Sequence, residues 1–379
     1  MNKNKWLRFI PFLPLLLLLI CVNIYLDAGN RFHDLGDLVA QSLLNGNPTY
    51  VRHGNLDERK LKQCIMANMP NYIDCAAVGS SIVLCVSSGD AGQESFFNLG
   101  TATADFYDIL SQLGFMASLN KKLGRLIFCI DAIFFAESIY NSSAHQIIHA
   151  RMKQYADYII KIMDGENVKA PEYNGSILAR LDELFYQLFS VAYFQSNIAY
   201  LKNNINAKNI NSESDPRYGI VKDTENYPGF YYMPDGSLVY PKGSRDSYSK
   251  DNNIISDDDR NTPVNYGYNF DRFISAEHEH ASEYSKKYLD KLIKYLIDNG
   301  TQVEIFLCPL APALWDAYDE NLRPILSEAE NYCHEMAAKY NLKLTGSYNP
   351  YKVGIRNSDY YDARHVRREM LSKYFDFKP

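Results

Sequence analysis

The sequence is short of the features that mark several protein classes. Only 15 of its 379 residues are proline and 20 are glycine, too few for a fibrous or largely disordered chain. Its 39 Lys and Arg are outnumbered by 45 Asp and Glu, and a net charge of −6 argues against a protein that binds duplex nucleic acid. Tryptophan occurs twice, whereas tyrosine occurs 30 times. What remains is a globular composition, long enough for one large or two ordinary domains.

The seven cysteines lack the spacing of a disulfide framework or a zinc ribbon, and most lie in apolar runs, so we expect buried thiols. His278 and His280, which flank Glu279, would lie on different faces of a helix. His145 and His149 have the spacing of a zinc-binding pair, but no third ligand is evident. The sequence therefore predicts no metal and no cofactor.

Long uncharged runs are also scarce, and the one that is present lies at the N-terminus. Residues 9 to 26 carry no charge, and as a helix they would span about 27 Å, enough for the hydrocarbon core of a bilayer. Three basic residues precede the run and Asp27 follows it, which leaves the N-terminus in the cytoplasm. A cleaved signal peptide has the same charge order, but residues 21 to 26 contain no small-x-small cleavage site. We predict a single-pass anchor within residues 1 to 27 and an extracytoplasmic domain after it.

Short apolar runs alternate with helical segments along the rest of the chain. The expected strands lie at residues 75–78, 96–98, 126–130, 303–307 and 342–344. The expected helices have apolar residues three or four apart and lie at residues 103–116, 276–298 and 324–340. Strands separated by helices indicate an α/β fold, with a parallel sheet covered by helices on both faces. In such sheets functional residues follow the C-terminal ends of the strands.

The chain divides further into a neck and an interrupted domain. Residues 28 to 70 predict a helical neck, and residues 71 to 379 predict one domain with an insertion at about 151 to 272. The first part of the insertion is helical, and the second is rich in Tyr, Asn, Asp and Ser. Tyrosine rings stack on sugars, so the candidate substrate contacts are Tyr231, Tyr232 and Tyr240. The alternative is a long loop whose aromatic side chains pack on the domain.

Two loops after expected strands carry residues with a chemical use. Gly79, Ser80 and Ser81 form a small-residue turn that would expose a nucleophilic serine beside backbone N–H groups able to bind an oxyanion. The plainer interpretation is that one of these serines caps a helix. After the next strand, Asn98 precedes Gly100, whose amide could approach a reacting carbonyl closely. A tight turn explains that glycine equally well.

A third loop lies just before the last expected helix. Asp362 and His365 are three positions apart, so the carboxylate can accept from one imidazole N–H. The other ring nitrogen is then left to take a proton from a serine. Asp362 could instead be the N-cap of the last helix.

Together, the three loops resemble the SGNH/GDSL hydrolase family in their order and placement. A Gly-Ser-Ser motif stands where that family has Gly-Asp-Ser, so the resemblance makes Ser81 the nucleophile. Gly100 matches the glycine whose amide joins that of Ser81 in the oxyanion hole. Asp362 and His365 match the acid and base of the last block. The resemblance covers about residues 70 to 135 and 275 to 379, and it implies a flavodoxin-like three-layer fold.

The closer likeness is to the membrane-anchored branch of that family. This branch includes the D-alanine transfer protein of teichoic acid synthesis and the alginate-type O-acetylation proteins. The N-terminal anchor, residues 97 to 100, residues 308 to 312 and the late Asp-x-x-His all resemble it. The likeness implies an acyltransferase or esterase acting on acetyl or D-alanyl esters of a cell-surface polysaccharide or teichoic acid. It also implies a partner, a multipass membrane O-acyltransferase that delivers the acyl group.

One departure from the family concerns the oxyanion hole. The third block, Gly-x-Asn-Asp, supplies an asparagine donor, but here Asp131 follows the third strand and no asparagine is present. Either the hole has two backbone donors, or a side chain such as Asn98 contributes. The loss of one donor costs about 10² to 10³ in rate. The alternatives are therefore a plain esterase and a catalytically weak or inactive polysaccharide-binding or assembly factor.

Overall fold

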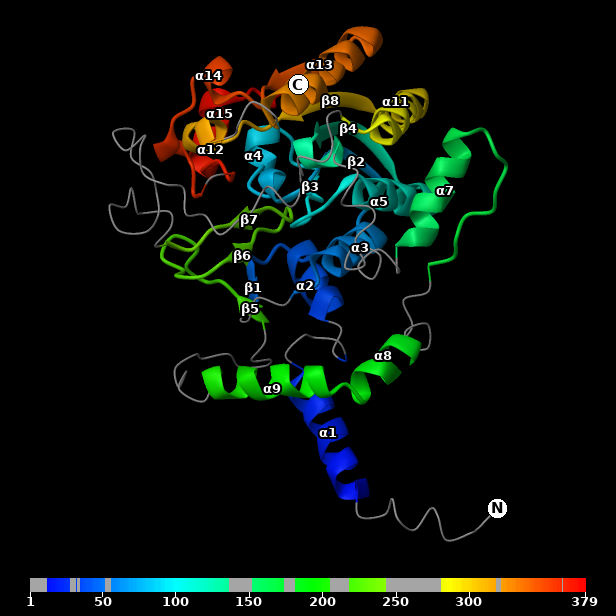
Figure 1. Ribbon diagram of the computed structural model, residues 1–379, viewed down its shortest axis with the longest axis vertical. Coiled ribbons are helices and arrows are strands. Elements are labelled where there is room, and N and C mark those ends of the chain that lie inside the picture. Colours follow the sequence, from blue (N-terminus) through cyan, green and yellow to red (C-terminus); the bar gives the residue numbers. More distant parts are fainter. Residues whose placement is uncertain are drawn as a thin grey trace.

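The computed structural model describes these parts of the chain: residues 12–27, 32, 35–51, 56–135, 152–173, 181–204, 218–242, 281–317, 322–362 and 364–379. A five-stranded parallel sheet lies at the centre of the body (Figure 1). From edge to edge its strands are β3 (Phe96–Asn98), β2 (Tyr72–Val78), β4 (Lys122–Cys129), β8 (Gln302–Leu307) and β9 (Lys343–Gly346). In chain order this is the 2-1-3-4-5 arrangement of flavodoxin-like sheets, whose switch point lies between β2 and β4.

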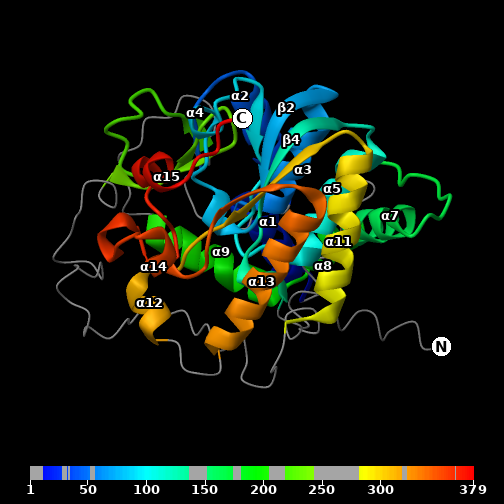
Figure 2. The same cartoon turned by 90° about the horizontal axis from the view of Figure 1, so that it is seen from above.

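Successive strand residues point into two separate cores, one on each face of the sheet. On β4, Leu126 and Phe128 lie in the larger core, whereas Ile127 and Cys129 lie in the smaller one. The larger core is lined by α3 (Glu58–Asn68), α5 (Phe106–Ser118), α7 (Lys153–Met163), α11 (Glu283–Asp298) and α13 (Leu322–Tyr340). The smaller core is lined by α4 (Ser88–Ala91), α12 (Pro312–Ala317), α14 (Pro350–Val353) and α15 (Arg368–Tyr374) (Figure 2). The predicted α/β class, with helices on both faces of a parallel sheet, is confirmed.

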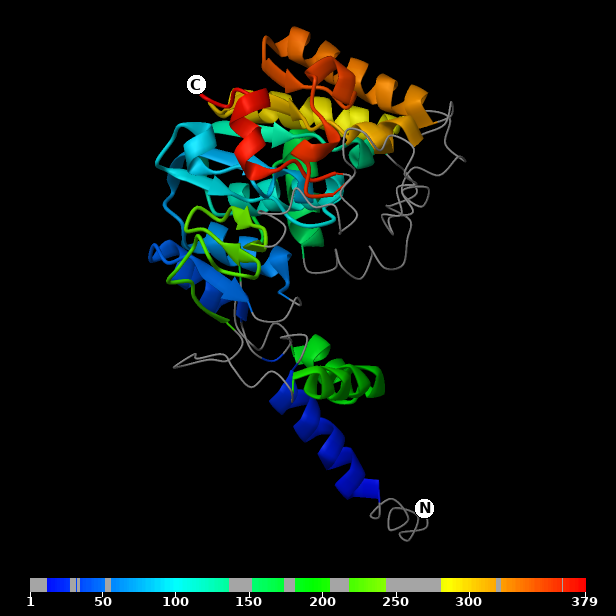
Figure 3. The same cartoon turned by 90° about the vertical axis from the view of Figure 1, so that its left-hand side faces the viewer.

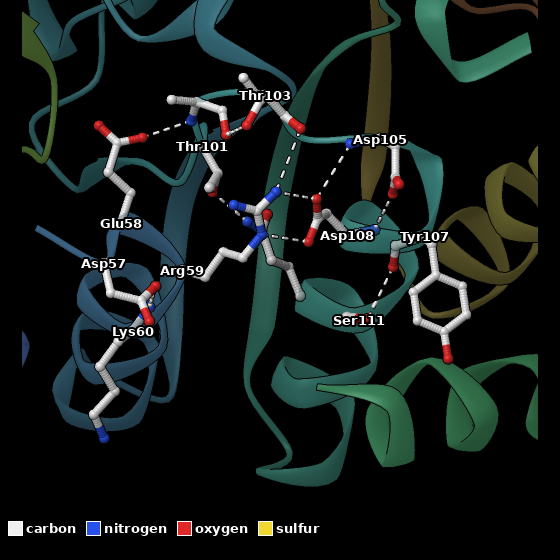
Figure 4. Close-up of polar contacts among 12 residues, drawn as sticks. Asp57, Glu58, Arg59, Lys60, Thr101, Thr103, Asp105, Tyr107, Asp108 and Ser111 are labelled. Atoms are coloured by element: carbon white, nitrogen blue, oxygen red, sulfur yellow. Dashed lines mark hydrogen bonds and ion pairs between the residues drawn. The ribbon is translucent and has the colours of Figure 1, made fainter. Parts of the chain in front are cut away.

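The segment before the sheet forms α2 (Leu35–Leu44), β1 (Thr49–Val51) and α3, and the apolar faces of both helices are buried in the larger core. The first turn of α3 also holds the loop after β3 (Figure 4). Arg59 donates from Nε and Nη2 to the two carboxylate oxygens of Asp108, at 2.8 and 2.6 Å. Beside it, the Glu58 carboxylate accepts from the Ala102 N–H. These hydrogen bonds hold the segment between β3 and the first turn of α5 against α3.

The insertion adds a second, antiparallel sheet that the sequence did not predict. Its strands in order are β5 (Tyr218–Ile220), β1, β6 (Tyr231–Tyr232) and β7 (Leu238–Val239). The turn between β6 and β7 contacts the end of β3, because the N–H of Asn98 donates to the Asp235 carbonyl at 2.7 Å. The buried ammonium of Lys62 donates to the carbonyls of Asn98 and Gly236, each at 2.8 Å. This hairpin therefore lies beside the strand ends where functional residues are expected.

Three helices stand apart from the body (Figure 1 and Figure 3). α1 (Leu13–Leu26) projects from it, and α9 (Val191–Asn204), which follows α8 (Leu181–Leu188), lies across the C-terminal end of α1. The helices predicted for the first part of the insertion are confirmed by α7, α8 and α9. Residues 9–11 of the predicted anchor lie outside the described residues. Among the helices of the described ranges, none is both long and apolar enough to cross a membrane.

Candidate active site

Ser81 and Asp362 lie within hydrogen-bonding distance of the two ring nitrogens of His365. Ser81 opens a short 3₁₀ turn directly after β2, and its Oγ is 2.8 Å from Nε2 of His365, a residue 284 positions away in the chain. The other ring nitrogen, Nδ1, is 2.7 Å from Oδ2 of Asp362. His365 is nearly buried and Ser81 is partly exposed. The structure thus brings together, at the carboxyl end of β2, the three residues predicted as nucleophile, base and acid.

The carboxylate of Asp362 is bound to its own loop as well as to the imidazole. Its Oδ1 accepts from the backbone N–H groups of Arg364 and His365, each at 2.9 Å. Burial by itself would raise the pKa of this carboxyl. The hydrogen bond and charge of His365, together with the two backbone N–H groups, outweigh that effect, so the pKa lies below its ordinary value. The N-cap of α15 is Arg367, so the alternative interpretation of Asp362 as the cap of the last helix is wrong.

A second hydrogen-bond network, which the sequence did not predict, lies beside that of Ser81, His365 and Asp362. Two of its members, Ser80 and Arg364, directly precede Ser81 and His365 in the chain. Ser80 donates its hydroxyl to Oδ2 of Asp131 at 2.5 Å, and Arg364 donates from Nη2 to the same oxygen at 2.7 Å. Ser80 and Asp131 are each 3% exposed, so a buried carboxylate is neutralised between the two loops that carry Ser81 and His365. Asp131 follows β4, which lies next to β2 at the switch point of the sheet.

The two serines of the turn therefore have different partners. Ser80 occupies the N-cap position of the 3₁₀ turn, but its side chain makes no capping hydrogen bond and is held by Asp131 instead. Ser81 contacts His365. The interpretation of either serine as a side-chain helix cap is thus wrong for this turn. Only Ser81 has the partner that a nucleophile requires.

Asn98 and Gly100 were predicted as oxyanion donors, and the structure gives them other partners. The fully buried amide of Asn98 donates from Nδ2 to three backbone carbonyls of the segment that follows Ser81, those of Val83, Leu84 and Val86. Its Oδ1 accepts from the N–H of Gly100 at 2.9 Å. Asn98 is therefore a brace for the loop after Ser81. The prediction that its amide donates to an oxyanion is wrong, and the Gly100 amide is engaged by that brace.

Of the three tyrosines predicted to contact substrate, one lies at the site. Tyr231 and Tyr232 are almost fully buried, and their hydroxyls donate to the Thr224 carbonyl and to the Glu58 carboxylate. Both are core residues of the hairpin, so their prediction as substrate contacts is wrong. Tyr240 is partly exposed and has its ring centroid 5.9 Å from that of His365.

The ring of Tyr240 packs against aromatic side chains of the His365 loop and of the insertion. It stacks on Tyr361 of the His365 loop, with ring centroids 4.1 Å apart and planes 7° apart. It also contacts Phe230, which is 49% exposed. A row of aromatic rings therefore runs from the buried imidazole through the partly exposed Tyr240 to the exposed Phe230 of the insertion. The second sheet is what brings these rings to the site, and no periodicity in the sequence reveals it.

The cysteines and the remaining histidines are the other candidates for a nucleophile or a metal site. Six cysteines are free and buried, as expected, whereas Cys21 is exposed. Burial raises the pKa of the Cys85 thiol, near the turn, to about 12, so it stays protonated. His145, His149, His278, Glu279 and His280 lie outside the described residues. Within the described residues no three His, Cys, Asp or Glu side chains are grouped to hold a metal ion.

Comparison of the sequence with protein-family models and with curated proteins found no match.

Proposed function

We propose that the protein is an SGNH-type serine acyltransferase or esterase, anchored in the membrane by residues 9–26 with its catalytic domain outside the cytoplasm. The contact of Ser81 Oγ with His365 Nε2, backed by Asp362 on Nδ1, carries the proposal. This is the arrangement that activates a serine hydroxyl at neutral pH. The position of Ser81 at the carboxyl end of β2, beside the switch point, supports it, because ligands of such sheets bind there.

The reaction proceeds in two transfers. Ser81 Oγ attacks the acyl carbonyl while His365 Nε2 takes the hydroxyl proton, and Asp362 stabilises the imidazolium. The tetrahedral intermediate collapses as His365 returns the proton to the leaving oxygen, which leaves an acyl ester on Ser81. A hydroxyl of the acceptor, or water, then attacks this ester and gives its proton to His365. The acyl group passes to the acceptor and the serine is restored.

Charge on the intermediate is stabilised without the asparagine of the family pattern. The backbone N–H of Ser81 remains the predicted donor, at the start of its 3₁₀ turn. Arg364 is paired with the buried carboxylate of Asp131, which also accepts from Ser80, so its charge is already neutralised. The pair instead ties the residue before Ser81 to the residue before His365 and so holds the two loops together.

The acceptor is a cell-envelope polysaccharide or teichoic acid, and the acyl group is acetyl or D-alanyl, as the resemblance implies. The partly exposed ring of Tyr240 beside His365, and the exposed ring of Phe230 next to it, support a sugar-containing acceptor, because aromatic rings stack on sugar faces. A multipass membrane O-acyltransferase is the proposed source of the acyl group. The second candidate is a catalytically weak or inactive binding or assembly factor, which Asp131 in place of asparagine favours.

A fluorophosphonate probe, which reacts with activated serines, separates these functions. We expect it to label the wild type and the Ser80→Ala variant but not Ser81→Ala. Ser80→Ala is the matched control, because it removes the neighbouring hydroxyl and its bond to Asp131. Labelling that survives Ser81→Ala, or a wild type that is never labelled, would contradict the enzymatic proposal. Release of acetate from a model ester without acceptor would identify the plain esterase.

A further inference from the structure

The α8 and α9 segment has an unusual composition for a surface. Residues 181 to 204 include six aromatic residues and only three charged ones. Four of its large apolar side chains are exposed: Leu201 at 38% near the end of α9, and, close together in the chain, Phe185 at 65%, Phe189 at 40% and Val191 at 58%. The rings of Phe185 and Phe189 contact each other, with centroids 4.9 Å apart. They form one apolar patch at the elbow where α8 meets α9.

Polar residues of α1 fix this elbow in place. The fully buried Asn23 donates from Nδ2 to the carbonyls of Gln187, Leu188 and Ser190, at 3.1, 3.1 and 3.2 Å. Its Oδ1 accepts from Asn197 of α9 at 3.1 Å. An asparagine in an otherwise leucine-rich helix thus shares its two amide hydrogens among three carbonyls at the end of α8 and the start of α9.

A second bond holds α9 at the point where α1 ends. Tyr193 of α9 donates its hydroxyl to Asp27, the residue directly after α1, at 2.5 Å. Asp27 is also the first charged residue after the uncharged run. The charge marks the level at which a membrane-inserted α1 would reach water. The bond from Tyr193 therefore places α9 at that same level.

The orientation of α9 relative to α1 is the one expected if α1 crosses a bilayer and α9 lies on its surface. α9 lies across the axis of α1, on the side of the body from which α1 projects (Figure 1 and Figure 3). The leucines of α1 are largely exposed, Leu15 at 65% and Leu18 at 54%, so α1 presents an apolar surface on the part that precedes its contacts with the elbow. Helices that lie in the membrane interface combine apolar and aromatic residues in this way, with aromatic rings at headgroup level.

We propose that the α8–α9 elbow is a lipid-contacting platform that lies in the headgroup region of the membrane. It inserts Phe185, Phe189 and Val191 among the acyl chains at their headgroup ends. The proposal rests on the proposed anchor and not on the enzymatic activity. Its partner is the bilayer surface. The platform fixes the orientation of α1 relative to the body, since Asn23 and Asp27 bind both of its helices.

Tryptophan quenching by brominated lipids tests the platform in the full-length chain. Phe185→Trp and Phe189→Trp are placed in a Trp6→Phe background and reconstituted into phosphatidylcholine vesicles. The vesicles contain lipids brominated near either the headgroup end or the methyl end of the acyl chains. The matched control is Tyr351→Trp, at a side chain that is 52% exposed on α14, far from α1 (Figure 1). Each signal is read as the difference from the background protein.

We expect headgroup-end bromines to reduce the added fluorescence of Phe185→Trp and Phe189→Trp more than methyl-end bromines do, with no loss for Tyr351→Trp. In an added Asn23→Leu change, the quenching should fall while the protein still floats with the vesicles. Protein that floats but shows no more quenching than Tyr351→Trp would overturn the platform and leave the anchor standing. Protein that does not float would overturn both. Labelling of Ser81 by the fluorophosphonate reports on the enzymatic proposal separately.

Discussion

Replacing Asp362 by asparagine tests what the carboxylate contributes to the serine. In the wild type Oδ1 accepts two backbone N–H groups, and the carboxylate faces Nδ1 of His365. The single carbonyl oxygen of an asparagine would stay on those backbone donors, so its NH₂ group would face Nδ1. Nδ1 must then accept a hydrogen bond, and the imidazole proton moves to Nε2. A protonated Nε2 cannot take the proton of Ser81.

The expected loss in turnover is about 10⁴-fold, which corresponds to about 5 kcal/mol of transition-state stabilisation. Stability should change far less, because the backbone hydrogen bonds remain. The pKa of Asp362 is lowered in the fold, so its charge stabilises the protein at pH values above the unfolded-state pKa. That contribution is lost as the pH falls through the folded-state pKa. The small stability difference between wild type and Asp362→Asn should therefore shrink on acidification.

The assay is the single-turnover acylation rate with a chromogenic ester, measured beside urea unfolding at neutral and acidic pH. Glu369→Gln is the matched control, because it also replaces a carboxylate by an amide on the same segment, at a side chain that is 47% exposed. The control should acylate at the wild-type rate. Near-normal acylation by Asp362→Asn would refute the assignment of tautomer control to this carboxylate, and with it the mechanism above.

Three further predictions concern the residues around the triad. Lys62→Met should cost about 2 kcal/mol or more in urea unfolding, because two buried carbonyls lose their donor. Burial lowers the pKa of Lys62 to about 8 from 10.5, so wild-type stability should gain from this group as the pH rises between those values, and the variant should lack that gain. Gly100→Ala would place a Cβ 2.5 Å from a Val83 methyl group, so kcat should fall at least about 10-fold. In Gly89→Ala the Cβ would make only an ordinary contact with the Ser87 hydroxyl at 3.7 Å, so kcat should not change. Arg364→Gln should destabilise the protein by about 3 to 5 kcal/mol, and adding Asp131→Asn should restore much of that loss, as a double-mutant cycle in urea will measure.

The central parallel sheet could be predicted because each of its strands has a local signal in the sequence. The approach of Ser81 to His365 could be predicted from that sheet. Each central strand is a short apolar run buried on both faces, and each is followed by residues that end it. Parallel strands bring their carboxyl ends to one edge, so Ser81 and the segment around His365 were expected to meet. The spacing of Asp362 and His365 is itself a local signal, and the structure has the two in contact.

The second sheet could not be predicted, because its strands have two or three residues and pair with distant parts of the chain. β1 precedes the central sheet in the chain, whereas β5, β6 and β7 belong to the insertion. Too few residues alternate to give a period. The tyrosines of β6 were misassigned for a related reason. Tyr232 carries a polar hydroxyl, and nothing in the sequence reveals that Glu58 lies within reach to accept from it inside the core.

The partners of the two serines show how a distant residue decides a local assignment. Ser80 and Ser81 are chemically equal in the sequence, and family resemblance alone favoured the second. In the structure, consecutive residues at the end of β2 point in different directions, so Ser80 meets Asp131 and Ser81 meets His365. Asp131 lies 51 positions from Ser80, and Arg364 lies 233 positions from Asp131, so no local pattern could show this network. The residue that departs from the family pattern is therefore the one that binds the hydroxyl of Ser80 and leaves Ser81 as the serine in contact with the base.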